Sequence, residues 1–176
     1  EVPGAFLSVA QLVAWEEEGV DSSPALLEKA RQRGFTIHDG DMQELHLTHN
    51  SYEVVTMWDV IEHLDDPKGF LETILTLLKP GGVLFFHTGN ANFQIAKAQL
   101  LSKLFPNRGP WIIPFQHIYH FDPASGQAIS AAAGFEPISA FFCGTLHYRH
   151  AKKRLSLGAY NALTHSLTKI GWPLYT

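Results

Sequence analysis

Acidic residues close three short β-rich segments of this sequence, and their carboxylates are well suited to bind a polar ligand. These residues are Asp21, then Asp39 and Asp41, then Asp59 and Glu62 with His63 beside them. A carboxylate accepts hydrogen bonds from both hydroxyls of a ribose, and an acid or a main-chain carbonyl accepts one from an exocyclic amine. Each acid alone is more simply explained as a helix cap that faces water. Their coincidence at three successive strand ends favours one nucleoside-like ligand.

Histidines supply the second kind of chemistry. His87 lies near the end of a further β-rich segment, and His117 and His120 lie three residues apart in "QHIYHF". A histidine near a hydroxyl acceptor is a candidate general base, although an ordinary hydrogen bond is the commoner role of a loop histidine. Two histidines can also share a metal ion. The sequence shows no clear third ligand for them and no strong ligand spacing for His63, so it predicts no metal site.

Short strands alternate with helical periodicity, which predicts an α/β domain with a mainly parallel sheet. The expected helices cover 5–14, 23–34, 67–79, 93–105 and 124–133, and the expected strands cover 17–21, 35–41, 52–59, 83–88 and 135–143. Ser23 as N-cap and Pro24 at the first helical position mark one helix start. The apolar run in 52–59 predicts a strand that is buried on both faces. In such a sheet, ligands collect beyond the carboxyl ends of the strands.

Composition limits the function classes. The chain has 176 residues, which predicts one domain over 1–176, and its formal net charge of −4 gives no general case for binding nucleic acid. One cysteine, Cys143, rules out an internal disulfide and a cysteine-rich zinc site, and fits a cytoplasmic protein. No segment reaches the roughly 20 apolar residues that span a bilayer, and the first residues do not resemble a signal peptide.

Several motifs occur in the order expected of a known family. They are "GVDSSP" (19–24), "GDMQEL" (40–45), "YEVVTMWDVIEHLDDP" (52–67), "LLKPGGVLFFHTGN" (77–90) and "HFDPASGQAISAAAGFE" (120–136). Together they resemble class I S-adenosylmethionine-dependent methyltransferases, of the methyltransferase-domain group related to ubiquinone-biosynthesis O-methyltransferases. The resemblance covers roughly residues 1–144. It implies a Rossmann-like, doubly wound sheet.

The resemblance also implies S-adenosyl-L-methionine as cofactor and S-adenosyl-L-homocysteine as product. The cofactor-binding residues that it implies are Gly4, Asp21, Ser22, Asp41, Met42, Met57, Trp58, Asp59 and His63. Asp21 would bind the ribose, Asp41 would face the adenine amine, and Met42 would pack on the ring. Trp58 would wall the pocket or simply pack in the core. His63 would hold its loop or face the substrate.

The first motif of the family is incomplete in this sequence. A glycine-rich turn normally follows the first strand and lets the backbone approach the cofactor. Only Gly4, in "EVPGAF", corresponds to it, and we expect that part of this loop is absent from the sequence given. The alternative is a degenerate relative that no longer binds cofactor.

The segment 91–121 is rich in aromatic residues and is the expected acceptor lid. It favours a hydrophobic or aromatic small molecule as acceptor. The resemblance implies methylation on oxygen, and His87, His117 and His120 are the candidate bases. The same surface would also suit packing on the domain, a second subunit, or peripheral membrane contact, as in a related branch of the family. Residues 151–176 show helical spacing and form the expected C-terminal extension.

Two other function classes stay open. A non-catalytic domain with the methyltransferase fold would act by binding a partner, as the incomplete first motif suggests. A nucleotide-dependent oxidoreductase would also bind ribose through an acid after the second strand. The ordered downstream motifs speak against the oxidoreductase.

Overall fold

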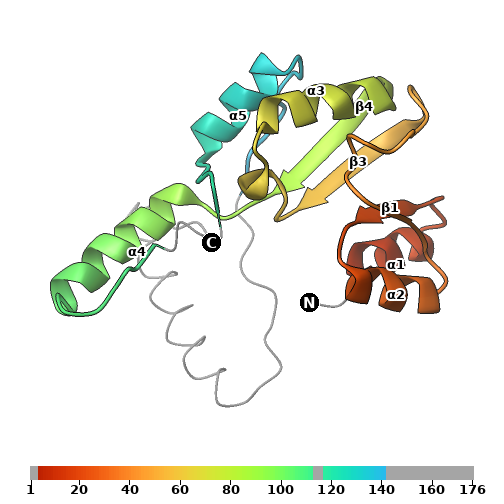
Figure 1. Ribbon diagram of the computed structural model, residues 1–176. Coiled ribbons are helices and arrows are strands. Elements are labelled where there is room, and N and C mark those ends of the chain that lie inside the picture. Colours follow the sequence, from red (N-terminus) through yellow and green to blue (C-terminus); the bar gives the residue numbers. More distant parts are fainter. Residues whose placement is uncertain (1–3, 113–116, 142–176) are drawn as a thin grey trace. The chain divides into compact units, whose positions relative to one another are not determined.

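The protein is seen in a computed structural model that describes residues 4–112 and 117–141 (Figure 1). The chain divides after Ser51 into two compact units, residues 1–51 and 52–176. The predicted extension over 151–176, and Cys143 with it, lies outside the described residues. None of the helices in the described ranges is long and apolar enough to cross a membrane.

The first unit pairs two strands with two helices. Its elements are α1 (Ala5–Leu12), β1 (Glu18–Asp21), α2 (Pro24–Gln32) and β2 (Thr36–Asp39). β1 and β2 are parallel, and their register places Asp21 beside Asp39. The buried side chains are few, with Leu27 and Ala30 of α2 and Phe35 among them. The predicted helix–strand alternation is therefore confirmed here.

Helix α2 begins and ends where its sequence signals predict. Ser23 is the N-cap and Pro24 occupies the first turn. After the helix, Gly34 adopts φ 84°, in the left-handed region that glycine reaches at low cost. The residues next to each end of α2 therefore determine where the helix begins and ends.

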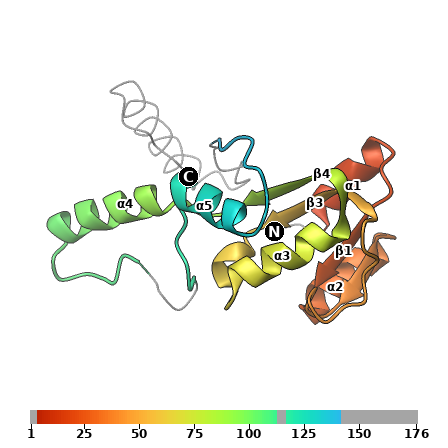
Figure 2. The same ribbon diagram turned by 90° about the horizontal axis from the view of Figure 1, so that it is seen from above.

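The second unit is built on another parallel pair. Its elements are β3 (Tyr52–Trp58), the 3-10 turn η1 (Ile61–His63), α3 (Pro67–Leu77), β4 (Leu78–His87), α4 (Ala91–Leu104) and α5 (Pro123–Ala132). β3 pairs with β4 in parallel, with Trp58 opposite His87. Helix α3 packs against β4 and lies beside α5 (Figures 1 and 2). Asn90 and Phe121 form a short parallel bridge between segments far apart in sequence.

One face of α3 supplies much of the buried core of this unit. That helix buries Phe70, Leu71, Ile74 and Leu77, a spacing that keeps one face apolar. The prediction that β3 is buried on both faces is wrong. Val54 is 37% exposed and Trp58 is 45% exposed. Among the described residues β3 pairs with β4 alone, so β3 is an edge strand of a two-stranded sheet and is not a central, covered strand.

The junction between α3 and β4 also differs from the prediction. The helix ends at Leu77 rather than residue 79, and β4 begins at once with Leu78. Pro80, Gly81 and Gly82 therefore lie inside the strand as an irregularity, which shifts the pairing from Tyr52–Leu78 to Val54–Val83. The φ of 78° at Gly81 shows why glycine is needed there.

The strand predicted over 135–143 is absent from its described part, 135–141. Ile138 is 85% exposed and Phe141 is 66% exposed. An extended segment becomes a strand only when its backbone groups pair with another strand, and no strand in the described part of the chain pairs with 135–141. The alternation of apolar residues in this segment was therefore not enough to predict a strand.

Gly4 allows a test of close packing in the first unit. A Cβ atom there would lie 2.7 Å from Phe35 Cε2, and Gly4 has φ 68°. We expect Gly4→Ala to lower the free energy of unfolding by about 2–4 kcal/mol, from left-handed backbone strain plus overpacking. Gly34→Ala is the matched control, since its φ is also positive but its Cβ would meet nothing within 4 Å. Urea denaturation giving equal losses for both variants would contradict the packing part of this prediction.

The N-terminus of α5 allows a test of capping. Asp122 Oδ1 accepts from the Ser125 backbone N–H at 2.8 Å, and Ser125 Oγ accepts from the Asp122 N–H at 2.9 Å. The bonds from Ser125 hold the pKa of the Asp122 carboxyl below its ordinary value. We expect Asp122→Ala to cost about 1 kcal/mol of unfolding free energy at neutral pH.

Asp122→Asn distinguishes the contribution of the charge from that of the capping hydrogen bond, because asparagine carries no charge but keeps the acceptor oxygen at every pH. Since the folded pKa of Asp122 is lowered, its stabilisation is complete above the unfolded pKa and is lost as pH falls through the folded pKa. The stability advantage of aspartate over asparagine should therefore shrink in acid. Urea denaturation of both proteins at pH 7 and pH 3 measures this, and a constant difference would refute it.

Candidate functional site

The first unit gathers predicted cofactor residues at the carboxyl ends of β1 and β2. Asp21 and Asp39 are register neighbours, so their Cα atoms are about 4.8 Å apart across the ladder. Asp21 Oδ1 accepts from the Ser23 backbone N–H at 2.7 Å, and the Asp21 carbonyl accepts from Gly40 N–H at 3.2 Å. One carboxylate oxygen of Asp21 therefore orders the loop before α2, as the capping alternative expects. Ser22 is exposed in the same loop.

Asp41 and Met42 follow directly in the turn after β2. Asp41 Oδ1 accepts from the Gln43 N–H at 2.9 Å, which fixes the turn. Met42 is half-buried. Gly4, the remaining predicted contact in this unit, is the N-cap of α1 and packs on Phe35. Asp21, Asp41 and Gly4 thus have structural roles, and Asp21 and Asp39 share one end of the small sheet.

The second unit gathers the other predicted residues at the ends of β3 and β4. Met57 is buried, whereas Trp58 is largely exposed and stacks on the His87 ring with centroids 5.8 Å apart. Trp58 also contacts Phe85, with ring centroids 5.2 Å apart. The indole therefore lies exposed at the strand ends and is not a buried core residue.

Asp59 and His87 form a pair across these strand ends. Asp59 Oδ1 lies 2.9 Å from His87 Nδ1, and the Asp59 N–H donates to the His87 carbonyl at 3.0 Å. A carboxylate only accepts, so the neutral imidazole carries its proton on Nδ1 and leaves Nε2 as an acceptor. Asp59 also has φ 52°, unusual for a residue with a side chain. Such backbone strain concentrates at functional sites.

Thr88, directly after β4, is a polar residue that the sequence analysis missed. Its Oγ1 atom is buried and has no hydrogen-bond partner among the described residues. A buried hydroxyl without a partner costs free energy unless a ligand or water satisfies it. Its place after a strand, in the "HTGN" that follows β4, was the signal that could have identified it.

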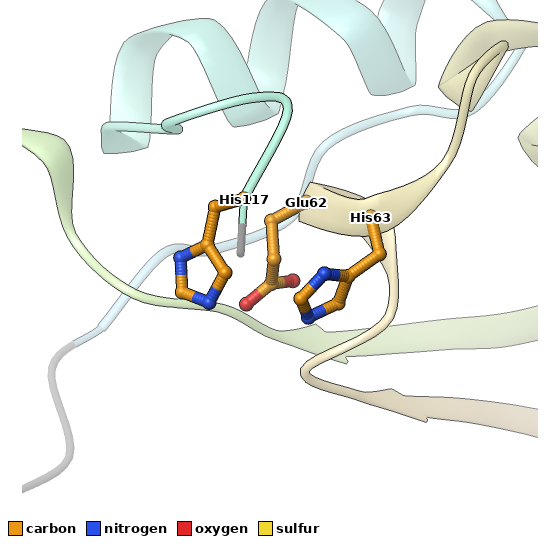
Figure 3. Close-up of side chains that lie close together, drawn as sticks. All are labelled: Glu62, His63 and His117. Atoms are coloured by element: carbon orange, nitrogen blue, oxygen red, sulfur yellow. The ribbon is translucent and has the colours of Figure 1, made fainter. Parts of the chain in front are cut away.

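The other histidine candidates lie in a different cluster. His63 and His117 meet edge to face with ring centroids 4.8 Å apart, and His120 lies 5.9 Å from His117. Glu62 joins His63 and His117, so that one ligand atom from each lies within 4.8 Å of the others (Figure 3). The sequence analysis considered His117 with His120 and found no third ligand. In the structure, His117 lies instead with Glu62 and His63.

Sequence comparison identifies the family. Residues 3–140 match the profile of a family described as a methyltransferase domain. The chain is 39% identical over 93 residues to a ubiquinone biosynthesis O-methyltransferase of Bordetella avium, covering 49% of this chain and 36% of that protein. A protein of the same name from Haemophilus ducreyi is 33% identical over 104 residues, covering 50% of this chain and 44% of the relative. The chain thus spans less than half the length of these relatives.

Structural comparison agrees. A crystal structure of an S-adenosylmethionine-dependent methyltransferase from Mesorhizobium loti superposes with a TM-score of 0.63 at 19% identity, covering 93% of this chain and 81% of that one. At this identity the likeness shows the fold alone. The class I fold, and S-adenosylmethionine as the cofactor of the family, are confirmed as predicted from the ordered motifs. The chain belongs to the methyltransferase-domain family.

Proposed function

We propose that this chain transfers the methyl group of S-adenosyl-L-methionine to an oxygen of a small-molecule acceptor and leaves S-adenosyl-L-homocysteine. The match of residues 3–140 to the methyltransferase domain carries this proposal. The name of the relatives, ubiquinone biosynthesis O-methyltransferase, supports oxygen as the methylated atom. A single domain over 1–176 and a cytoplasmic location remain part of the proposal.

The acids of the first unit are proposed to hold the adenosine. Asp21 uses one oxygen for Ser23 and has a second with which to accept from ribose hydroxyls. Its neighbour Asp39 adds a like charge at the end of the ladder, and such pairs repel unless hydrogen-bond donors lie between them. Ribose hydroxyls are donors of this kind. Asp41 and Met42 are proposed to receive the adenine.

The second unit is proposed to carry the chemistry. Methyl transfer forms an oxygen–carbon bond while the carbon–sulfur bond breaks, and its electron pair neutralises the sulfonium. The acceptor must lose its hydroxyl proton, and His87 Nε2 is the base because Asp59 fixes the tautomer. The exposed face of Trp58 would stabilise the positive sulfur. The protein's remaining task is alignment of the three reacting atoms and exclusion of water.

Segment 91–121 is proposed as the acceptor lid. Helix α4 and the residue after it expose large apolar side chains: Ile95, Leu100, Leu104 and Phe105. This surface favours a hydrophobic or aromatic acceptor over a charged one such as nucleic acid. Peripheral contact with a membrane would use the same residues, so the acceptor and the membrane would meet at one surface.

A non-catalytic binding domain is the second candidate. Gly4, the remnant of the glycine-rich motif, is explained by its packing on Phe35 without a cofactor. Calorimetric titration with S-adenosylmethionine separates the candidates, because a pure binding domain would release no heat specific to this cofactor.

Asp21→Ala is expected to weaken S-adenosylmethionine binding by about 10- to 100-fold, the loss of a charged hydrogen bond worth about 1.5–3 kcal/mol. Glu28→Ala is the matched control, since Glu28 is an exposed acid of α2 in the same unit that bonds Gln32. Isothermal titration measures both dissociation constants. Unchanged affinity in the folded Asp21→Ala protein would remove the ribose assignment.

His87→Gln is expected to lower kcat by about 100-fold or more, the usual contribution of a general base, while cofactor affinity stays within about twofold. Asp59→Asn should lower kcat less, because it disturbs only the tautomer. The assay follows release of S-adenosylhomocysteine with a panel of phenols and catechols. His46→Gln, at an exposed histidine of the first unit, is the control. A His87→Gln enzyme with full kcat would exclude this base.

A further inference from the structure

Thr56 and Trp58 lie on the same face of strand β3. Alternate residues of a strand point to the same side of the sheet. The register places Phe85 of β4 opposite Thr56, and His87 of β4 opposite Trp58. Four side chains from two neighbouring strands therefore meet on one face of the pair, at the end that carries the proposed base.

The indole of Trp58 is in contact with the other three side chains. Its Nε1–H donates to Thr56 Oγ1 at 3.2 Å. Its ring lies 5.2 Å from that of Phe85, with the planes tilted by 48°, and 5.8 Å from that of His87, with the planes 28° apart. The χ2 torsion of an aromatic side chain is broad, so ring contacts alone define its plane poorly. The hydrogen bond is the directional contact of the three.

The threonine is well suited to hold this ring. Trp58 is 45% exposed, so packing restrains its side chain less than it restrains a core residue. Thr56 is half-buried in the strand, and its β-branched side chain is stiff at χ1. Its hydroxyl oxygen is therefore an acceptor of fixed position for the indole N–H.

The contact between the indole and the imidazole is offset. With nearly parallel rings and centroids 5.8 Å apart, the His87 ring covers only part of one indole face. The proposed function puts the positive sulfur over the rest of the indole. A sulfonium there stands beside the base, which is the placement that transfer of a methyl group to a deprotonating oxygen requires.

We propose that Thr56 is a positioning residue for methyl transfer and acts by fixing the plane of the Trp58 indole. The inference rests on the proposed function, in which His87 is the base and Trp58 faces the sulfonium. The plane of the indole sets where the methyl donor lies relative to the imidazole, and the Thr56 hydroxyl sets that plane. Thr56 itself touches neither the donor nor the acceptor.

Strand propensity does not explain the hydroxyl. The two residues before Thr56 are Val54 and Val55, which are also β-branched, so valine would serve the strand equally well. The bond from the indole is exposed, so water would satisfy both groups in its absence. Its contribution is therefore orientation of the ring more than stability of the fold.

Thr56→Val tests the inference, because it keeps the branched shape and removes the acceptor. We expect it to weaken S-adenosylmethionine binding by about 2- to 10-fold, the range of one neutral hydrogen bond. We expect kcat with the panel of phenols and catechols to fall by about 10-fold, because donor and base are misaligned. Thr56→Ser keeps the acceptor and should stay within about twofold of the wild type in both constants. Thr56→Ala replaces the valine variant if valine prevents folding.

A double-mutant cycle with Trp58→Phe shows whether Thr56 acts through the indole. Phenylalanine has no N–H, so Thr56→Val should change neither constant by more than about twofold in the Trp58→Phe protein. The same loss in both backgrounds would overturn the inference. Wild-type affinity and kcat in the single Thr56→Val protein would also overturn it.

Thr76→Val is the matched control. Thr76 is an exposed threonine of α3 in the same unit, and its hydroxyl donates to the Thr73 carbonyl at 2.8 Å. This variant should keep the affinity and kcat of the wild type. A loss equal to that of Thr56→Val would show a general effect of removing a hydroxyl and would overturn the positioning role.

The position of the indole can be measured without cofactor. Nuclear Overhauser contacts between the Trp58 indole and the His87 ring, assigned by their absence in Trp58→Phe, should be present in the wild type and in Thr56→Ser. They should be lost in Thr56→Val. Contacts of equal strength in all three proteins would overturn the inference, because a purely structural hydroxyl would leave the ring in place.

The two proposals fail in different proteins. Methyl transfer by the wild type, together with full activity in Thr56→Val, would keep the proposed function and overturn the role of Thr56. A wild-type chain that neither binds S-adenosylmethionine nor transfers its methyl group would refute the proposed function and remove the positioning role with it.

Discussion

Parallel pairing of strands is the constraint on which the candidate chemistry depends. Because β3 and β4 run in the same direction, their carboxyl ends meet, and the register sets Trp58 opposite His87. The next residue, Asp59, then bonds His87 twice, with its backbone N–H to the His87 carbonyl and with its carboxylate to the imidazole. An antiparallel pair would have sent these residues to opposite ends of the sheet. The same rule places Asp21 beside Asp39 in the first unit.

Local signals in the sequence predicted most of the elements. Ser23 and Pro24 marked the start of α2, and Asp66 and Pro67 marked that of α3, where the Asp66 carboxylate accepts from the Gly69 N–H at 3.0 Å. These signals work because a cap and its helix are neighbours in sequence. The exposure of β3 and the absence of a strand over 135–141 were not predictable in this way. Both depend on which strands find partners, and that is a property of the fold.

The cluster of Glu62, His63 and His117 shows the same limit at a site. The acids and His87 could be predicted as site residues because each lies at the end of a strand or shortly after it. His117 belongs to no such pattern. Two backbone hydrogen bonds to the Glu62 carbonyl bring its loop to the turn η1. Bonds to a main-chain carbonyl leave no trace in side-chain identity, so no spacing in the sequence joins His117 to Glu62 and His63.

Two charge arrangements among the described residues are unfavourable in the protein alone. The carboxylates of Asp21 and Asp39 are neighbours at one strand edge, and the carboxylate of Glu62 is buried. Each costs free energy in the protein alone, the first by repulsion and the second by desolvation. A chain selected only for stability would replace them with neutral residues. The ribose hydroxyls of the proposed cofactor site would relieve the first, so that binding free energy offsets a cost built into the folded protein.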